Sequence, residues 1–279
     1  MGSIKLNYKI GDLDINRLGY GAMQLTGKGV FGEVEDRDNA KKVLQAAIAG
    51  GVNFIDTAEA YGPKLNESLI AEALYPYKDD LLIATKGGFD RPGPNKWVPN
   101  GAAQNISQNI EGSLQRLKVD TIDLWQLHRV DPNVHVEETL APVVAAVKAG
   151  KIRYVGLSEV TIEQIKQVQQ ILPIVSVQNL YNLSDRKWED VLDFTDEQGL
   201  AFIPWYPLAS GPVKLEDKIK AIAQKHAATT AQIALAWLLK RSSNILLIPG
   251  TKSISHLEEN LKAADIELSD EEFKTLSEQ

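Results

Sequence analysis

The chain contains no cysteine, and this absence excludes a disulfide framework, a thiolate nucleophile and a cysteine-ligated metal. Histidine is also scarce, with four residues scattered at positions 128, 135, 226 and 256. No His-Glu-x-x-His spacing places two of them on one face of a helix. We therefore expect no metal site.

The sequence also lacks a block of basic residues and a long apolar run. With 30 basic and 37 acidic residues the net charge is −7, whereas a surface that binds nucleic acid is basic. No apolar run approaches the ~18 residues of a membrane-spanning helix, and residues 1–9 lack the apolar core of a signal peptide. We expect a cytoplasmic monomer with no nucleic-acid or membrane partner.

The 279 residues, 44% of them hydrophobic, have the composition of a globular protein. Eight short apolar runs are present, at 16–21, 52–57, 81–86, 121–128, 153–158, 174–181, 201–205 and 245–250. They alternate with stripes of helical period at 40–48, 106–117, 140–147, 162–172, 188–197, 230–240 and 256–263. Thr161-x-x-Gln164 and Ser255-x-x-Glu258 predict capping boxes for two of these helices. Runs that are apolar throughout, such as 81–84, are typical of strands covered by helices on both faces.

This alternation predicts an α/β fold of the (β/α)8 TIM-barrel type, with residues 1–279 as a single domain, because no linker interrupts it. A doubly wound open sheet is the alternative, although it usually needs fewer strands. Residues 4–13 are expected to form a β-hairpin that closes the barrel bottom. Two long connections, 87–104 and 206–229, are expected to form pocket walls, and the second carries an additional helical segment.

The residues at the ends of the predicted strands carry the chemistry, because these ends converge on one site in a barrel. They are Asp56, Lys86, His128, Ser158, Gln178, Trp205 and Gly250, with Tyr61 five residues beyond Asp56. Each of them alone has a structural explanation; Asp56, for example, could cap the next helix. Burying several ionisable groups together, however, is costly unless they pair.

The four ionisable side chains have complementary properties. A tyrosine hydroxyl, with a pKa of ~10, becomes a useful proton donor or acceptor near neutrality if a nearby cation stabilises the phenolate. Lys86 can supply that charge, Asp56 can hold the ammonium, and His128 can orient a substrate oxygen. The set suits the protonation of a carbonyl group. In an alternative reading, Lys86 is the Schiff-base nucleophile of an aldolase-like barrel.

A series of motifs resembles those of the aldo-keto reductase superfamily in order and spacing, from residue 17 to residue 261. The motifs are DTAEAYG at 56–62, TK at 85–86, LH at 127–128, VGLS at 155–158, VQNLYN at 177–182, IPGT at 248–251 and EEN at 258–260. The resemblance implies a barrel that reduces aldehydes or ketones to alcohols by hydride transfer from NADPH. Overall, the sequence is similar to bacterial members that reduce small aldehydes, pyridoxal among them.

The same resemblance implies a role for each residue. Tyr61 would be the general acid in reduction, with Lys86 and Asp56 tuning it and His128 positioning the carbonyl. Ser158 and Gln178 would hold the nicotinamide carboxamide, and Trp205 would stack on the ring. The remaining cofactor residues would be Gly21, Met23, Asp56, Leu208, Ser210, Gly250, Thr251, Lys252, His256, Glu259 and Asn260, of which Leu208 and Ser210 approach the pyrophosphate. Those from Gly250 onward hold the adenosine end.

Two positions depart from the pattern of this superfamily. Glu159 stands where many members have asparagine, and an ionised carboxylate accepts hydrogen bonds but donates none. His256 stands where many members have arginine, and histidine is mostly neutral at pH 7. Since Lys252 could compensate, NADPH is favoured and NADH stays an alternative. A non-catalytic NADPH-binding redox sensor is a further alternative.

Two further patterns concern the loops around the expected site. Residues 27–32 match G-x-G-x-x-G but lack the strand-turn-helix context, so we interpret them as a loop. Side chains expected at the rim of the mouth are Met23, Phe31, Phe89, Trp97 and Arg129. They favour an apolar or aromatic carbonyl substrate with a polar handle, although each could simply pack a loop.

Overall fold

The computed structural model describes residues 6–208 and 216–278. Its main sheet has seven parallel strands in the spatial order β11-β10-β9-β8-β5-β4-β3. These strands are β3 (Tyr20–Gly21), β4 (Phe54–Asp56), β5 (Leu82–Gly87), β8 (Ile122–Leu127), β9 (Ile152–Ser158), β10 (Ser176–Gln178) and β11 (Ala201–Phe202). They are short, buried and mostly apolar, as the sequence predicted for strands with helices outside them.

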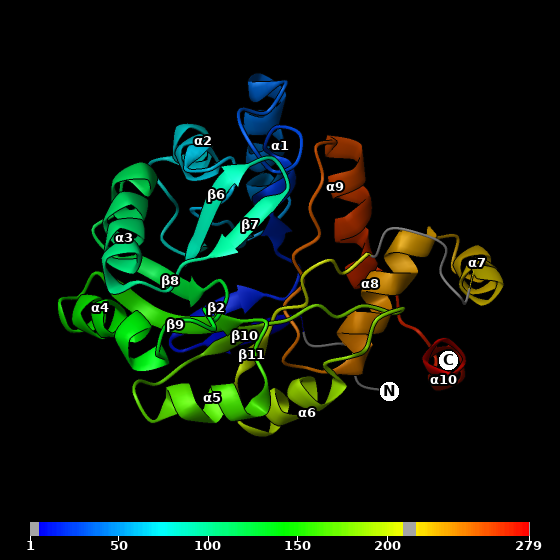
Figure 1. The fold of residues 1–279 in the computed structure, drawn as a ribbon. Helices are drawn as coiled ribbons and strands as arrows, with labels where there is room; N and C mark the ends of the chain where they lie inside the picture. The colour runs from blue at the N-terminus through cyan, green and yellow to red at the C-terminus, as the bar shows by residue number, and fades with distance from the viewer. Residues whose placement is uncertain (1–5, 209–215, 279) are drawn as a thin grey trace.

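The eighth apolar run closes this sheet. Residues 245–250 form no regular strand, but Ile245 bridges Phe202 and Leu247 bridges Leu18, both in parallel. The run therefore joins β11 at one edge to the segment that leads into β3 at the other. This connection makes the sheet an α/β barrel and contradicts the open-sheet alternative (Figure 1).

Helices surround the strands. The ring consists of α1 (Arg37–Ala49), α2 (Leu65–Leu74), α3 (Ala103–Leu117), α4 (Val136–Lys148), α5 (Ile162–Gln169), α6 (Glu189–Glu197), α8 (Thr230–Arg241) and α9 (Ile254–Leu261). Two more, α7 (Glu216–Lys225) and α10 (Asp270–Ser277), pack together at one side (Figure 1). Two 3-10 turns are η1 (Ala22–Gln24) and η2 (Lys262–Asp265).

The helix caps test two sequence predictions. The capping box of Thr161 and Gln164 is present at the start of α5. The one predicted at Ser255 and Glu258 is wrong, because α9 begins earlier and its N-cap is Ser253, whose hydroxyl accepts from the His256 N–H. Ser253, two residues upstream of the predicted Ser255, therefore caps the helix instead.

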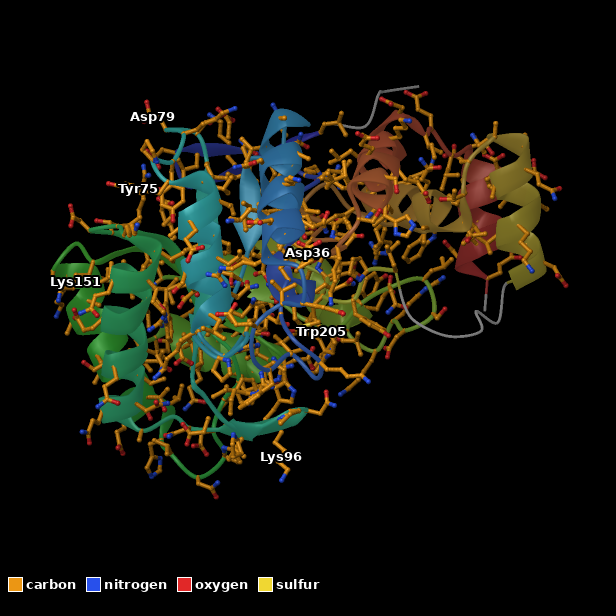
Figure 2. All side chains as sticks on the ribbon, turned by 90° about the horizontal axis from the view of Figure 1, so that it is seen from above. Asp36, Tyr75, Asp79, Lys96, Lys151 and Trp205 are labelled. Carbon is orange, nitrogen blue, oxygen red and sulfur yellow. The ribbon has the colours of Figure 1, made fainter. Side chains whose placement is uncertain are left out.

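Two hairpins lie at opposite ends of the barrel. At one end, β1 (Asn7–Ile10) pairs antiparallel with β2 (Leu13–Asn16), three residues later than predicted, and its Ile10 and Ile15 pack against inward-facing strand residues. At the other end, β6 (Phe89–Gly93) pairs with β7 (Lys96–Pro99) within the long connection after β5. Tyr75 and Asp79 lie in the connection from α2 into β5, where the barrel strands begin, and Figure 2 shows Lys96 of β7 on the opposite side. The β6–β7 hairpin therefore lies at the mouth, where the strands end.

Candidate active site

A buried ion pair forms the floor of the mouth. Asp56 ends β4 and Lys86 lies near the end of the neighbouring β5, so the parallel pairing brings both side chains to one edge. The Lys86 Nζ donates to Asp56 Oδ2 at 2.6 Å, to the Thr57 carbonyl at 2.8 Å and to Tyr61 Oη at 3.3 Å. Lys86 is 0% exposed and Tyr61 5%. Three of the four predicted residues are therefore in hydrogen-bond contact.

His128 is the fourth residue of this group. It follows β8, its backbone N–H donates to the Gly87 carbonyl, and its ring lies edge-on to Tyr61 with 5.8 Å between centroids. Its Nδ1 is buried and has no hydrogen-bond partner among the described residues. Burial first, and then the positive charge of Lys86, lowers the His128 pKa well below its ordinary value. The ring is consequently neutral at pH 7 and carries one N–H.

The phenol of Tyr61 is protonated at neutral pH. Burial raises the Tyr61 pKa, and the charge of Lys86 opposes this without cancelling it. For Lys86, burial acts to lower the pKa, but the Asp56 carboxylate outweighs it and the pKa is raised. Lys86 thus acts in the expected direction on the phenol, but burial dominates. The site holds a charged ammonium beside a phenol that can donate a proton.

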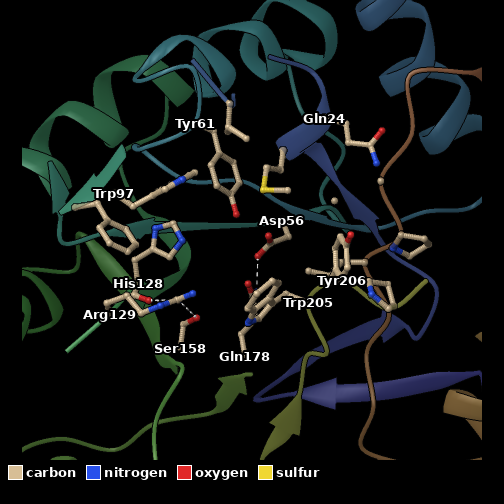
Figure 3. A pocket seen from close by; sticks show the side chains of 18 of the residues that line it. Gln24, Asp56, Tyr61, Trp97, His128, Arg129, Ser158, Gln178, Trp205 and Tyr206 are labelled. Atoms are coloured by element: carbon tan, nitrogen blue, oxygen red, sulfur yellow. Dashed lines mark hydrogen bonds between the residues drawn. The ribbon is translucent and has the colours of Figure 1, made fainter. Parts of the chain in front are cut away.

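The Asp56 carboxylate also ties strands together inside the barrel. Its Oδ1 accepts from Gln178 Nε2 at 2.8 Å (Figure 3). The same oxygen accepts from Gln126 Nε2 at 3.3 Å, while Oδ2 accepts from Lys86. Gln178, assigned to the cofactor by resemblance, is therefore a partner of Asp56. Sequence reasoning missed Gln126, although a polar residue within the buried strand β8 is itself a signal.

The last residue of β9, Ser158, and the residue after it, Glu159, have partners that the sequence did not predict. Ser158 Oγ accepts from Arg129 Nη1 at 3.0 Å (Figure 3). Glu159 has a φ of 55°, and its Oε1 accepts from Trp205 Nε1 at 2.7 Å and from the Leu180 N–H at 2.5 Å. The carboxylate in place of asparagine therefore holds the Trp205 indole in place, which gives the departure at Glu159 a structural role.

A cavity of about 680 Å³ lies at the mouth of the barrel, and many of the predicted site residues line it. Of the predicted residues, its lining contains Gly21, Met23, Asp56, Tyr61, Phe89, Trp97, His128, Arg129, Ser158, Gln178, Trp205, Leu208 and Gly250. Sequence reasoning did not single out Gln24, Val30, Pro99, Val130, Tyr206, Pro207, Ile248 and Pro249, although Pro99, Tyr206 and Pro207 lie in the two long connections that it expected to form pocket walls. Phe31 is not in the lining; its neighbour Val30 is, and the Phe31 ring lies 5.9 Å from the Arg91 guanidinium carbon. Loop residues such as these have no periodicity that could have revealed them.

The other predicted cofactor residues lie beyond Gly250, at and along α9. Thr251 is buried and its carbonyl accepts from Tyr20 Oη, whereas Lys252 and His256 are exposed near the helix N-terminus. Asn260 is buried and Glu259 is half-buried. A helix N-terminus beside a lysine suits a phosphate group. Ser210 lies outside the described residues.

The mouth fits a nicotinamide dinucleotide on two observations. A Cβ at Gly250 would come within 2.6 Å of the Gly21 carbonyl oxygen, so only glycine allows the cavity wall to run so close to the backbone here. The indole of Trp205, fixed by Glu159, offers a flat ring in the same wall. Within residues 6–208 and 216–278, no three His, Cys, Asp or Glu residues could hold a metal ion, and no helix is long and apolar enough to cross a membrane.

Known proteins resemble this chain over nearly its whole length. An uncharacterized oxidoreductase of Schizosaccharomyces pombe is 50% identical over 97% of this chain and 89% of the relative. Pyridoxine 4-dehydrogenase of Escherichia coli is 40% identical over 96% of both chains. Among solved structures, the thermostable aldo-keto reductase Tm1743 bound to the inhibitor epalrestat matches with a TM-score of 0.87 and 31% identity, covering 98% and 99% of the two chains.

A further solved structure carries a cofactor. An aldo-keto reductase from Klebsiella pneumoniae in complex with NADPH matches with a TM-score of 0.82 and 27% identity, over 98% of this chain and 94% of that one. The model of the aldo/keto reductase family matches residues 17–279. This match includes every side chain of the buried cluster, and the chain therefore belongs to the aldo-keto reductase family.

Proposed function

We propose that residues 1–279 form a single-domain, NADPH-dependent oxidoreductase that reduces aldehydes or ketones to alcohols. The observation that carries this proposal is the contact of Lys86 Nζ with both Asp56 and Tyr61, beside a neutral His128. Bound NADPH would supply the hydride, and every protein group needed to protonate a carbonyl oxygen is at hand.

Each of the four side chains has one task in the proposed reduction. Tyr61 donates its Oη proton to the carbonyl oxygen, and the adjacent Lys86 ammonium stabilises the phenolate that results. Asp56 keeps Lys86 charged and fixed through the 2.6 Å bond. The neutral His128 ring hydrogen-bonds the carbonyl oxygen and so orients the substrate.

The cofactor would lie along the wall that contains Trp205, Leu208, Gly21, Met23 and Gly250. Ser158 and Gln178 face the same cavity. The adenosine end would reach α9, where Thr251, Lys252, His256, Glu259 and Asn260 are gathered. The exposed Lys252 favours NADPH over NADH, because a 2′-phosphate needs a cationic partner.

The alternatives have different support. The similarity to pyridoxine 4-dehydrogenase makes pyridoxal a candidate substrate. An aldolase-like Schiff base requires a neutral Lys86 amine, and the bonds of its ammonium to Asp56 and the Thr57 carbonyl oppose this. The redox-sensor alternative differs only in lacking turnover, so kinetics decides it.

The test is NADPH oxidation by the purified protein with benzaldehyde and with pyridoxal. Tyr61→Phe should lower kcat by about 10²–10⁴-fold while NADPH still quenches tryptophan fluorescence. Tyr75→Phe is the matched control, because Tyr75 is 53% exposed and lies far from the mouth (Figure 2). Unchanged turnover in Tyr61→Phe would refute the roles given above. Tight NADPH binding without turnover of any carbonyl would favour the sensor.

A further inference from the structure

Arg129 is a cation built into the cavity wall. It follows His128, and its Nη1 donates to the His128 carbonyl at 2.6 Å and to Ser158 Oγ at 3.0 Å. Its guanidinium carbon lies 5.7 Å from the Phe89 ring centroid and 5.8 Å from that of Trp205. Two hydrogen bonds and two aromatic rings therefore hold the group in one orientation (Figure 3).

The remaining donors of this guanidinium have no acceptor among the described residues. Within the described part of the chain, neither Nε nor Nη2 of Arg129 donates a hydrogen bond, and no carboxylate forms a salt bridge with it. Glu159 is near enough to raise the Arg129 pKa against the lowering effect of burial, but its Oε1 is occupied by Trp205 and Leu180. Neither Nε nor Nη2 is shut off from solvent. Both donors of this half-buried cation are therefore accessible to an anionic acceptor that a ligand brings into the cavity.

The position of Arg129 defines where that acceptor would lie. Its charge acts on both Tyr61 and His128, the two groups that would receive the carbonyl oxygen. Phe89 and Trp97, which line the same cavity, lie edge-on to the His128 ring at 4.7 and 6.0 Å between centroids. Phe89 and Trp97 also lie edge-on to each other, with 5.4 Å between centroids, so they form one aromatic wall against which a substrate ring can pack. A planar guanidinium fork matches a carboxylate or phenolate.

We propose that Arg129 is a specificity-determining residue that selects aromatic aldehydes carrying an oxyanion, a carboxylate or phenolate, on the ring. This inference rests on the proposed carbonyl reduction and adds the substrate class. The aromatic walls hold the ring, Tyr61 and His128 take the aldehyde oxygen, and Arg129 pairs with the anionic substituent.

Matched substrates test this selection. The 3- and 4-formylbenzoates and their neutral methyl esters differ in charge at almost constant size. Of the two formylbenzoates, the one that the wild-type protein uses better should have a kcat/KM about 10-fold to about 100-fold higher than its own methyl ester. The difference should arise mainly in KM, because a charge-assisted hydrogen bond to the substrate has that strength. Arg129→Gln should abolish the preference, and Arg129→Lys, which keeps the charge without the fork, should retain part of it. Lys78→Gln removes an exposed charge elsewhere and should retain all of it.

Binding measurements keep the inference testable if a variant is unstable or turnover is absent. Benzoate should quench the tryptophan fluorescence of the wild-type NADPH complex at lower concentration than benzamide. Equal use of acid and ester by the wild-type protein, or equal binding of benzoate and benzamide, would overturn the inference. An equal loss for acid and ester in Arg129→Gln, with weaker NADPH binding, would assign Arg129 to the cofactor. No turnover of acid or ester, with benzoate still preferred, would instead refute the proposed reduction.

Discussion

At the scale of single residues, burial controls the ionisation of the proposed catalytic pair. The Tyr61 pKa is raised above its ordinary value of ~10, and the His128 pKa is lowered well below ~6.5. Reduction needs the protonated phenol, which is present below the Tyr61 pKa, and the neutral imidazole, which is present above the His128 pKa. Both shifts widen the pH interval in which the two forms coexist.

We therefore predict that kcat/KM for benzaldehyde reduction is constant from about pH 7 to about pH 9.5 and falls only at higher pH. Initial rates at constant ionic strength, with NADPH saturating and a substrate that does not titrate, would measure this. A decline centred near pH 8 would contradict it, and would mean that Lys86 outweighs burial in the functional complex. An inflection near pH 6.5 would mean that His128 is exposed to solvent.

At the scale of elements, the hairpin of β6 and β7 depends on Arg91. This side chain donates from Nε to the Lys96 carbonyl at 2.8 Å, from Nη1 to the Ala60 carbonyl at 2.6 Å and from Nη2 to the Gly29 carbonyl at 3.1 Å. Its guanidinium carbon also lies 3.5 Å from the centroid of the Trp97 ring. One residue thus connects the hairpin to two other loops and holds Trp97 edge-on to Tyr61.

Removing this connection should loosen one wall of the cavity. We predict that Arg91→Ala raises KM for benzaldehyde by about 10-fold, since several charge-assisted bonds are lost, with a smaller effect on propanal, which does not need the wall. Arg91→Lys should recover little, because an ammonium cannot replace a fork with three directed donors. Lys96→Ala, an exposed change on the same hairpin, is the control. Equal KM increases for the two aldehydes would contradict a role in the wall.

The elements show what could be predicted from sequence. Asp56, Lys86 and His128 were found because strand ends are visible in the apolar pattern and a parallel barrel brings them together. The β6–β7 hairpin and α2 were missed, since neither has a clear period, whereas the Ser269 capping box could have revealed α10. The partners of Glu159 and Arg129 were not predictable, because they depend on how loops from different strands meet.

At the scale of the whole molecule, the barrel closes where residues 17–21 meet the run at 245–250. Arg17, 2% exposed, precedes β3, and its Nε donates to the Ile245 carbonyl at 2.9 Å. Its Nη2 donates to the carbonyls of Leu239 and Ser242. Burial lowers the Arg17 pKa to about 10, so the group stays charged at neutral pH. A single cation therefore satisfies backbone acceptors between α8 and the closing run.

Arg17→Met should open this junction, because it keeps much of the volume but leaves buried carbonyls without donors. We predict a loss of about 3–5 kcal/mol in the free energy of unfolding and a drop in Tm of about 10 °C, measured by calorimetry and urea titration. Arg153→Met is the matched control, because Arg153 pairs with Asp12 at the surface. This substitution should lower the free energy of unfolding by about 1 kcal/mol or less. Equal Tm values for the two variants would show that the junction does not depend on Arg17. Because Gly21 and Gly250 lie on opposite sides of the same junction and both line the cavity, Arg17→Met should also weaken NADPH binding below its Tm.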